Sequence, residues 1–92
     1  MTKAEELFQR KVRDLGCIVC RTHMGVRSDC DVHHILDTGR RIGEMFVLGL
    51  CPRHHRYGAN NSLYVSRHPH RQEFERRYGT ELELLELTKR LA

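Results

Sequence analysis

The stretch "DVHHILDTGRRIGEMFVLGLCPRHH", residues 31–55, decides the fold of this 92-residue chain. It places an adjacent histidine pair at each end, and the residues between the pairs read as two strands joined by a Gly/Arg loop. Four of the seven histidines of the chain lie in this stretch. A small protein rarely needs adjacent histidines at both ends of a hairpin for packing, so the stretch predicts a β-hairpin whose histidines belong to a functional site.

Helical patterns flank this hairpin on both sides. Each of two capping boxes, a Thr followed three residues later by a Glu, precedes apolar residues at helical spacing. Pro52 is placed to open a short helix that carries the second histidine pair. Before the hairpin, "CIVC" should form a tight turn that leads into a polar loop. The predicted helices are residues 3–15, a short helix that starts at 52, about 67–78, and 81–91.

Charge and composition narrow the class of protein. Sixteen basic and twelve acidic side chains give a formal charge of +4, and thirteen of the basic residues are arginines. Arginine presents a fork of donors that suits phosphate, so this bias fits a nucleic-acid partner as well as it fits a solvated surface. No apolar run reaches the roughly 20 residues that a membrane span requires. No secretory signal precedes the four cysteines, so we expect a reducing, cytoplasmic setting.

Two pairs of residues have the spacing of zinc ligands. Two residues separate Cys17 from Cys20, and two separate Cys51 from His54. Zinc takes four such ligands in a tetrahedron, usually as two close pairs that the fold brings together. The pattern therefore predicts one structural Zn2+ site. Cys30 is left over, and its place on the first predicted strand favours a small buried side chain.

The other histidines of the two pairs suggest a second site. With His54 assigned to zinc, His33, His34 and His55 have no role in the first site. A phosphodiester hydrolase needs a base that activates water and a divalent cation that neutralises the charge of the transition state. One of these histidines can be the base while others hold the ion.

This arrangement resembles the HNH, or ββα-metal, endonucleases over more than half of the chain. Many members bind a structural zinc through two CxxC pairs, and the histidine after the last ligand binds the catalytic metal; "CPRHH" fits this pattern, with His54 in place of the last cysteine. The resemblance implies that His34 is the general base and that His33 and His55 bind the catalytic ion. It also implies products with 5′-phosphate and 3′-hydroxyl ends. The working ion would be Mg2+ or Mn2+, although Zn2+ or Ni2+ can occupy a histidine-rich site in crystals.

Within that superfamily, the motifs "HHI", "GRRIGE", "LCPRHH" and "YGTELELL" look like those of the phage Ref group of recombination-enhancement nucleases. Those proteins act on DNA loaded with the RecA recombinase. The closer resemblance implies a phage or prophage role in recombination, in the cytoplasm of a bacterial host, with DNA and a RecA-type filament as partners. It also implies that His68 is the next metal ligand, with His70 as the competing candidate.

The chain departs from the HNH pattern at one position. The asparagine that usually orients the base lies on the second strand, but residues 45–50 read "MFVLGL". Either the backbone holds His34, or Asn60 or Asn61 reaches back to it. An inactive domain that keeps its zinc is therefore an alternative interpretation.

Charged side chains surround the histidines. Asp31 and Asp37 flank the first pair and either orient an imidazole or act as surface caps. Arginines on the hairpin loop and near the start of the late helix are candidates to contact DNA phosphates. These candidates are Arg40, Arg41, Arg67 and Arg71.

Together these features predict one α+β domain over residues 1–92. Its zinc-stapled ββα-metal core (HNH, treble-clef-like) covers about 17–78, with an N-terminal helix over 3–15 and a C-terminal helix over 81–91. The predicted function is metal-dependent DNA cleavage. The rival is a catalytically inactive zinc module that binds nucleic acid or a protein partner. That module needs only the zinc ligands and leaves the surplus histidines unexplained.

Overall fold

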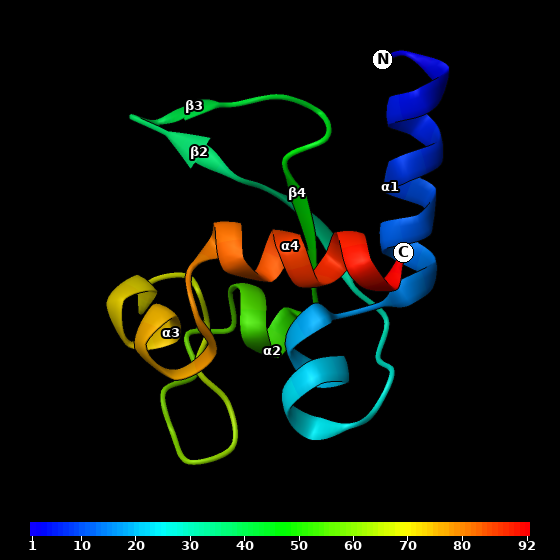
Figure 1. The fold of residues 1–92 in the computed structure, drawn as a ribbon. Helices are drawn as coiled ribbons and strands as arrows, with labels where there is room; N and C mark the ends of the chain where they lie inside the picture. Colours follow the sequence, from blue (N-terminus) through cyan, green and yellow to red (C-terminus); the bar gives the residue numbers. More distant parts are fainter.

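The computed structural model describes all 92 residues as a central two-stranded sheet surrounded by helices, with a second small sheet that projects from it (Figure 1). Helices and two small sheets agree with the predicted α+β class. The elements are α1 (Lys3–Leu15), the π-helical turn η1 (Cys20–Met24), β1 (Asp31–His34), β2 (Leu36–Asp37), β3 (Arg40–Arg41), β4 (Val47–Leu50), α2 (Pro52–His55), α3 (Arg71–Tyr78) and α4 (Glu81–Leu91).

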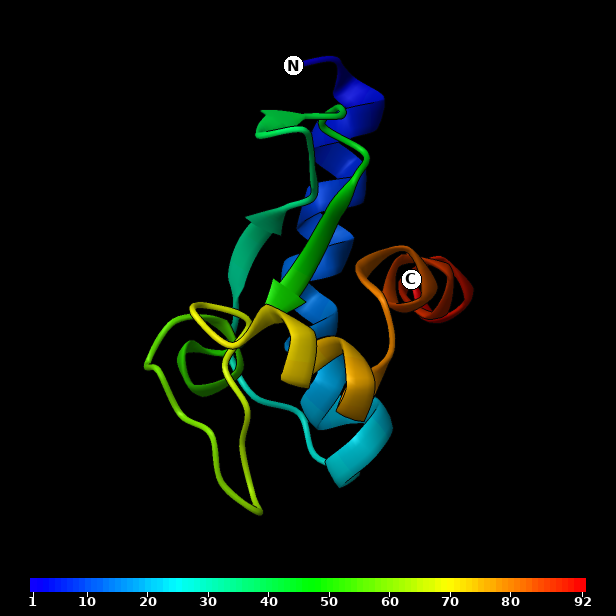
Figure 2. The same ribbon diagram turned by 90° about the vertical axis from the view of Figure 1, so that its left-hand side faces the viewer.

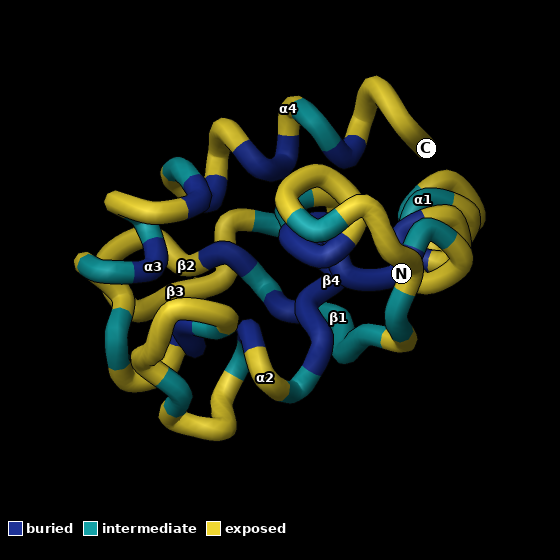
Figure 3. The backbone as a smooth tube through the Cα atoms, turned by 90° about the horizontal axis from the view of Figure 1, so that it is seen from below, coloured by how far each residue is buried: buried dark blue, intermediate teal, exposed yellow.

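The central sheet is an antiparallel pair of β1 and β4, in which Asp31 lies opposite Leu50 and His34 lies opposite Val47. All four residues of β4 are buried, and Figure 3 shows this strand in the interior of the molecule. Both α1 and α4 contact β4, and α2 contacts both strands of the pair. Figure 2 shows α1 running behind the strands, with α4 to one side of them. The helices therefore enclose the strand that precedes Cys51.

The connection between β1 and β4 contains two short strands, β2 and β3, where the sequence predicted only a loop. Its β2 and β3 pair with each other, with Leu36 opposite Arg41, and both short strands are exposed. Thr38 and Gly39, at the tip, have positive φ angles of 50° and 80°, as a tight turn requires. A turn closed by a 3.2 Å bond from the N–H of Phe46 to the carbonyl of Gly43 shortens the second predicted strand.

Both predicted capping boxes are present. Thr2 and Glu5 bond reciprocally at the start of α1, and Thr80 and Glu83 do so at the start of α4. At the other end of α1, the N–H of Gly16 bonds to two carbonyls of the last turn, which ends the helix where the sequence predicted. None of the helices has the length and apolar character that crossing a membrane would take.

The segment after "CIVC" differs from the polar loop that the sequence predicted. It continues as helix, because the N–H of Arg21 bonds to the carbonyl of Cys17 and the hydroxyl of Thr22 donates to the carbonyl of Ile18. The turn η1 ends at Gly25, which has the left-handed conformation that glycine adopts without strain. The two thiols of this segment thus sit on a helical turn.

The late helix begins at Arg71 rather than near residue 67. The N–H groups of Arg67 and His68 bond to the carbonyls of His54 and His55, at 2.8 and 2.9 Å, instead of entering a helix. The segment before α3 is therefore fastened to α2. This attachment brings His68 beside the second histidine pair.

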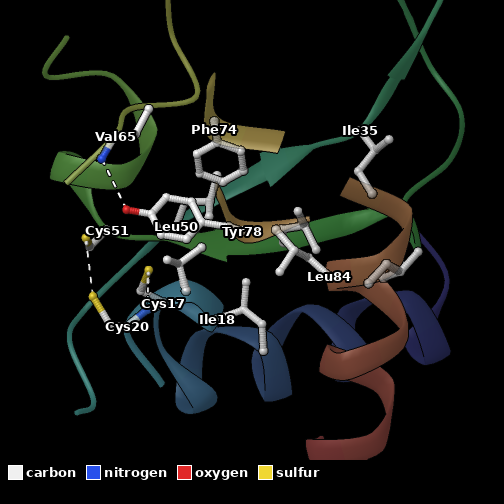
Figure 4. Packing of buried hydrophobic residues seen from close by; sticks show 13 residues of the cluster. Cys17, Ile18, Cys20, Ile35, Leu50, Cys51, Val65, Phe74, Tyr78 and Leu84 are labelled. Atoms are coloured by element: carbon white, nitrogen blue, oxygen red, sulfur yellow. Dashed lines mark hydrogen bonds between the residues drawn. The ribbon is translucent and has the colours of Figure 1, made fainter. Parts of the chain in front are cut away.

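The core lies between β4, the two C-terminal helices and the segment that follows α1 (Figure 4). Phe74 and Tyr78 of α3 pack edge to face, with ring centroids 5.1 Å apart. The hydroxyl of Tyr78 accepts a bond from the N–H of Val65, which anchors the loop that precedes α3. Cys17, Cys20 and Cys51 belong to the same buried cluster.

Gly49, in the middle of β4, generates a stability prediction. A Cβ atom at this position would lie 2.5 Å from the backbone oxygen of Gly16 and 2.8 Å from Sγ of Cys30. Gly49→Ala should therefore lower the free energy of unfolding by at least about 1–3 kcal/mol, the usual cost of overpacking. Urea unfolding of the purified variant measures the change.

Gly43→Ala is the matched control, because a Cβ there would meet only a side-chain atom of Phe46 at 3.6 Å. Its effect should be smaller than about 0.5 kcal/mol. Equal stability of the Gly49→Ala variant and the parent would contradict the close approach of β4 to the end of α1.

Candidate metal centres

Three thiols and one imidazole meet in the core, at the position of the predicted zinc site. Sγ of Cys20 lies 3.7 Å from Sγ of Cys51, and Nδ1 of His54 lies 3.2 to 3.5 Å from the sulfurs of Cys17, Cys20 and Cys51. A tetrahedral zinc with ordinary bond lengths separates two sulfurs by about 3.8 Å and a sulfur from a nitrogen by about 3.5 Å. The four donors are therefore spaced to hold a zinc ion.

Local backbone structure places each of these donors. Cys17 follows the glycine that ends α1, and its N–H bonds to the carbonyl of Ser28 at 3.0 Å. The N–H of Cys20 points at Sγ of Cys17, at 3.4 Å. Cys51 is the residue at which α2 begins, and the N–H of His54 returns to its carbonyl at 3.0 Å. The two predicted pairs therefore form two turns that face each other.

The electrostatics of this cluster favour a bound cation. The contact with Cys51 and burial raise the pKa of Cys17, and burial raises that of Cys20. The hydrogen bond from Cys17, together with His54, lowers the pKa of Cys51 to about 3. Since neighbouring buried thiolates repel one another, only a shared cation stabilises all three as thiolates.

The imidazole of His54 offers one nitrogen to this cluster and makes no hydrogen bond with its other nitrogen. Its Nε2 is buried without a hydrogen-bond partner, and the ring packs against Tyr64 and Tyr78 with centroids 5.1 and 5.2 Å away. A buried imidazole whose only polar contacts are thiols is suited to be a metal ligand. Cys30 lies outside the cluster, half-buried just before β1, and burial raises its pKa to about 11.

A second cluster consists of His33, His55 and His68, each with a ligand atom within 4.8 Å of those of the others. They come from β1, from α2 and from the segment before α3, and their ring centroids are 5.1 to 5.7 Å apart. His70, the competing candidate, is outside this cluster and contacts the carbonyl of Gly58 with Nε2 at 3.1 Å. The structure thus brings together the three histidines that the resemblance implied as ligands.

Carboxylates orient two of these three imidazoles. Oε2 of Glu81 lies 2.9 Å from Nε2 of His33, and Oδ2 of Asp31 lies 3.2 Å from Nδ1 of His55. A carboxylate only accepts, so each contacted nitrogen carries the proton, and the other nitrogen of the ring is left for an ion. Asp31 is therefore an orienting residue, whereas Asp37 lies on the exposed strand β2.

Glu81 is the buried centre of this arrangement. Its Oε1 accepts a bond from Nε of Arg67 at 2.7 Å, and both side chains are less than a tenth exposed. Burial by itself would raise the pKa of Glu81, but His33 and Arg67 outweigh it and lower the value to about 2. Burial, followed by the charge of Arg67, lowers the pKa of His68. His68 is therefore held as the neutral imidazole that a cation binds.

His34 points away from these carboxylates to a partner that the sequence did not indicate. Its Nε2 lies 3.1 Å from Oε2 of Glu44, and its Nδ1 makes no hydrogen bond to the protein. Glu44, rather than the backbone or an asparagine, is therefore the hydrogen-bond partner of the His34 ring. Asn60 forms a β-bridge with Val65, and the side-chain oxygen of Asn61 caps its own turn.

The predicted DNA-contacting arginines lie in two different environments. Arg40 and Arg41 are exposed on the projecting β2–β3 hairpin, and Arg71 is exposed at the start of α3, where it bonds to Glu75. Arg67 differs from the prediction. It precedes the helix and is buried against Glu81, because the segment before α3 is fastened to α2.

Sequence reasoning missed Glu44 and Glu81. Glu81 lies at the start of the predicted helix over 81–91, next to the capping Thr80, and it contacts His33 across 48 positions of sequence. Glu44 lies in the turn before β4, ten positions from His34. Both residues lie within quoted motifs, "GRRIGE" and "YGTELELL", but an acidic residue at a helix start or in a turn is ordinary, so the motifs did not indicate a histidine partner for either one.

The Cys/His cluster generates a prediction about metal content. The protein should contain one tightly bound zinc, and strong chelation should lower the thermal midpoint by more than about 10 °C, since a structural site contributes several kcal/mol to folding. Metal analysis and circular dichroism measure these two effects.

Cys20→Ser should lose the zinc, whereas Cys30→Ser, the matched control, should keep it. A midpoint that stays the same after complete removal of metal would contradict the structural role of the site.

A comparison with protein families places these clusters in a functional context. The chain matches, over residues 1–92, the family described as recombination enhancement, RecA-dependent nuclease. A search of curated proteins finds no match. The family match includes every residue of both clusters, and it agrees with the closer of the two resemblances that the motifs indicated. This chain therefore belongs to the family of recombination-enhancement, RecA-dependent nucleases.

Proposed function

We propose that this protein is an HNH-type (ββα-metal) endonuclease that hydrolyses DNA phosphodiester bonds with His34 as general base. One observation carries the proposal: His33, His55 and His68 converge from three segments, next in the chain to a fourth histidine with a free nitrogen. The family supports nuclease activity, and its description, recombination enhancement, suggests DNA as the substrate.

The proposed reaction begins at Nδ1 of His34. Because Nε2 lies against Glu44, Nδ1 has the lone pair that takes a proton from water as the water attacks phosphorus and the bond from phosphorus to the leaving 3′-oxygen breaks. His33, His55 and His68 would hold a Mg2+ or Mn2+ ion, which when bound neutralises charge on the phosphate and on the leaving oxygen. Glu81 and Asp31 keep His33 and His55 directed towards that ion.

The proposed structural zinc and the proposed catalytic site share α2. His54 faces the thiols, and His55, the next residue of the same short helix, faces His33 and His68. Zinc at the first cluster would therefore fix the position of a ligand in the second. The adjacency of the two histidines supports a single unit in which the zinc organises the catalytic centre.

The proposed DNA surface includes the β2–β3 hairpin and the start of α3. Arg40 and Arg41 are exposed on the hairpin, and Arg71 lines a hollow between the hairpin and α4. Glu81, which holds His33, lines the same hollow. A phosphate backbone that follows these arginines would pass beside the histidine cluster. Arg67 is buried here, so we assign it to positioning Glu81 rather than to the DNA surface.

We also propose a RecA-type filament as partner and phage or prophage recombination, in the cytoplasm of a bacterial cell, as the setting. The family description, which names RecA and recombination, supports the filament partner and the role in recombination.

The general base gives the first prediction for this function. His34→Ala should keep the fold, the zinc and the DNA affinity but lose about 10² to 10⁴ of the cleavage rate, the usual contribution of a positioned base. His68→Ala should also lose cleavage, together with affinity for Mn2+. The assay is nicking of supercoiled plasmid in Mg2+ or Mn2+, with and without RecA filaments.

His70→Ala is the matched control, because His70 lies outside the cluster and should leave cleavage unchanged. Full activity of His34→Ala would show that His34 is not the base. If the zinc-loaded parent binds DNA but never cuts it, with or without RecA, the protein is instead a zinc module that binds nucleic acid.

The arginines give a second prediction. Replacing Arg40, Arg41 and Arg71 with Ala should reduce the slope of log affinity against log salt by about 0.9 for each lost phosphate contact on duplex DNA, or about 2.7 in total. Fluorescence anisotropy at several salt concentrations measures this slope. The triple variant of Arg10, Lys11 and Arg90, exposed residues on α1 and α4, removes the same charge and should change the slope much less. Equal effects of the two triple variants would place the DNA elsewhere.

A further inference from the structure

Glu44 occupies the position where α1, the loop after β3 and the proposed base meet. Its Oε2 accepts a bond from Nε2 of Gln9 at 2.9 Å and lies 3.1 Å from Nε2 of His34. Nε2 of Gln9 is also 2.9 Å from the backbone oxygen of Glu44. Oε2 of Glu44 therefore accepts hydrogen bonds both from Gln9 of α1 and from His34 of β1.

These contacts determine which nitrogen of His34 carries the proton. Hydrogen bonds from His34 and Gln9 lower the pKa of Glu44, so the carboxylate is ionised at neutral pH. An ionised carboxylate only accepts, so Nε2 of His34 is the donor. Nδ1 is then the nitrogen with the lone pair. The hydrogen bond from Nε2 to Glu44 restricts rotation of the ring.

We propose that Glu44 is the positioning residue of the general base: it holds the His34 imidazole with Nδ1 directed at the water that attacks the phosphate, and Gln9 holds Glu44 in place. This inference rests on the proposed role of His34. It assigns to the carboxylate the task that an amide oxygen has in the HNH pattern, and it gives a role to the last residue of the "GRRIGE" motif.

Gln9 makes this position rigid. It is one of two buried residues of α1, only 5% exposed, and its amide reaches both the side chain and the backbone of Glu44. The second oxygen of Glu44 is less constrained, since its nearest cation, Nη1 of Arg41, is 4.0 Å away on an exposed side chain. The fixed oxygen is thus the one that faces His34.

The geometry provides two informative substitutions at Glu44. In Glu44→Gln the amide oxygen can take the place of Oε2 and accept from both Gln9 and His34, with the NH2 group on the open side. Glu44→Leu keeps a similar volume but accepts nothing. We therefore expect the single-turnover cleavage rate to fall about 10- to 100-fold in Glu44→Leu, the range for a lost orienting partner, and much less in Glu44→Gln.

A structural role alone would not produce this pattern. DNA affinity, zinc content and thermal midpoint should change little in Glu44→Leu, and Glu86→Leu, an exposed residue of α4, is the matched control for the lost charge. In a His34→Ala background, Glu44→Leu should cause no further loss of rate, because it acts through His34. A parent-like rate of Glu44→Leu, a loss confined to DNA affinity, or an equal loss with and without His34 would each overturn the proposal.

A measurement independent of activity separates this inference from the proposed function. Proton NMR of the zinc-loaded parent should show a protected imidazole N–H signal from His34, identified by its absence in His34→Ala. The signal should persist in Glu44→Gln and disappear in Glu44→Leu. If the parent never cuts DNA, the proposed function fails while the NMR result still decides the contact. If the parent cuts but the signal is absent or is the same in Glu44→Leu, the inference alone is wrong.

Discussion

The whole structure depends on the buried meeting of three thiols and one imidazole. Cys17 and Cys20 follow α1, while Cys51 and His54 follow β4, so this meeting ties the N-terminal helix to the end of the hairpin. The sulfurs lie too close together for all three to ionise without a cation, and their spacing matches that of a tetrahedral zinc. In a chain of 92 residues, such a site adds stability that a small core does not supply.

A second constraint is the contact between a carboxylate and one ring nitrogen, which occurs at three histidines. Asp31, Glu44 and Glu81 each contact one ring nitrogen of His55, His34 and His33 respectively. Each contact places the proton on one side of the ring and frees the other side. Binding to nucleic acid requires no such control of imidazole protons, whereas hydrolysis does. This repeated pairing is the reason to prefer a catalytic interpretation within the family over a zinc module that only binds.

The α2 helix connects the two constraints. It has only four residues, with Cys51 at its start, and its last two residues face different clusters. Its carbonyls also receive the N–H groups of Arg67 and His68, which brings the third histidine of the cluster into place. One short helix thus supports both candidate metal centres, and a displacement of His54 would be transmitted directly to His55.

The sequence by itself determined the two capped helices and the ligand pairs, because capping boxes and two-residue spacings act over a few positions. Thr2, Thr80 and the Cys51–His54 pair have the local structure that their patterns predict. Only the tertiary structure decided the partners of His33 and His34. Glu81 lies 48 positions from His33, and Glu44 meets His34 only because the loop before β4 turns back against α1. Contacts of this kind depend on how whole elements pack, and a pattern in the sequence does not record that packing.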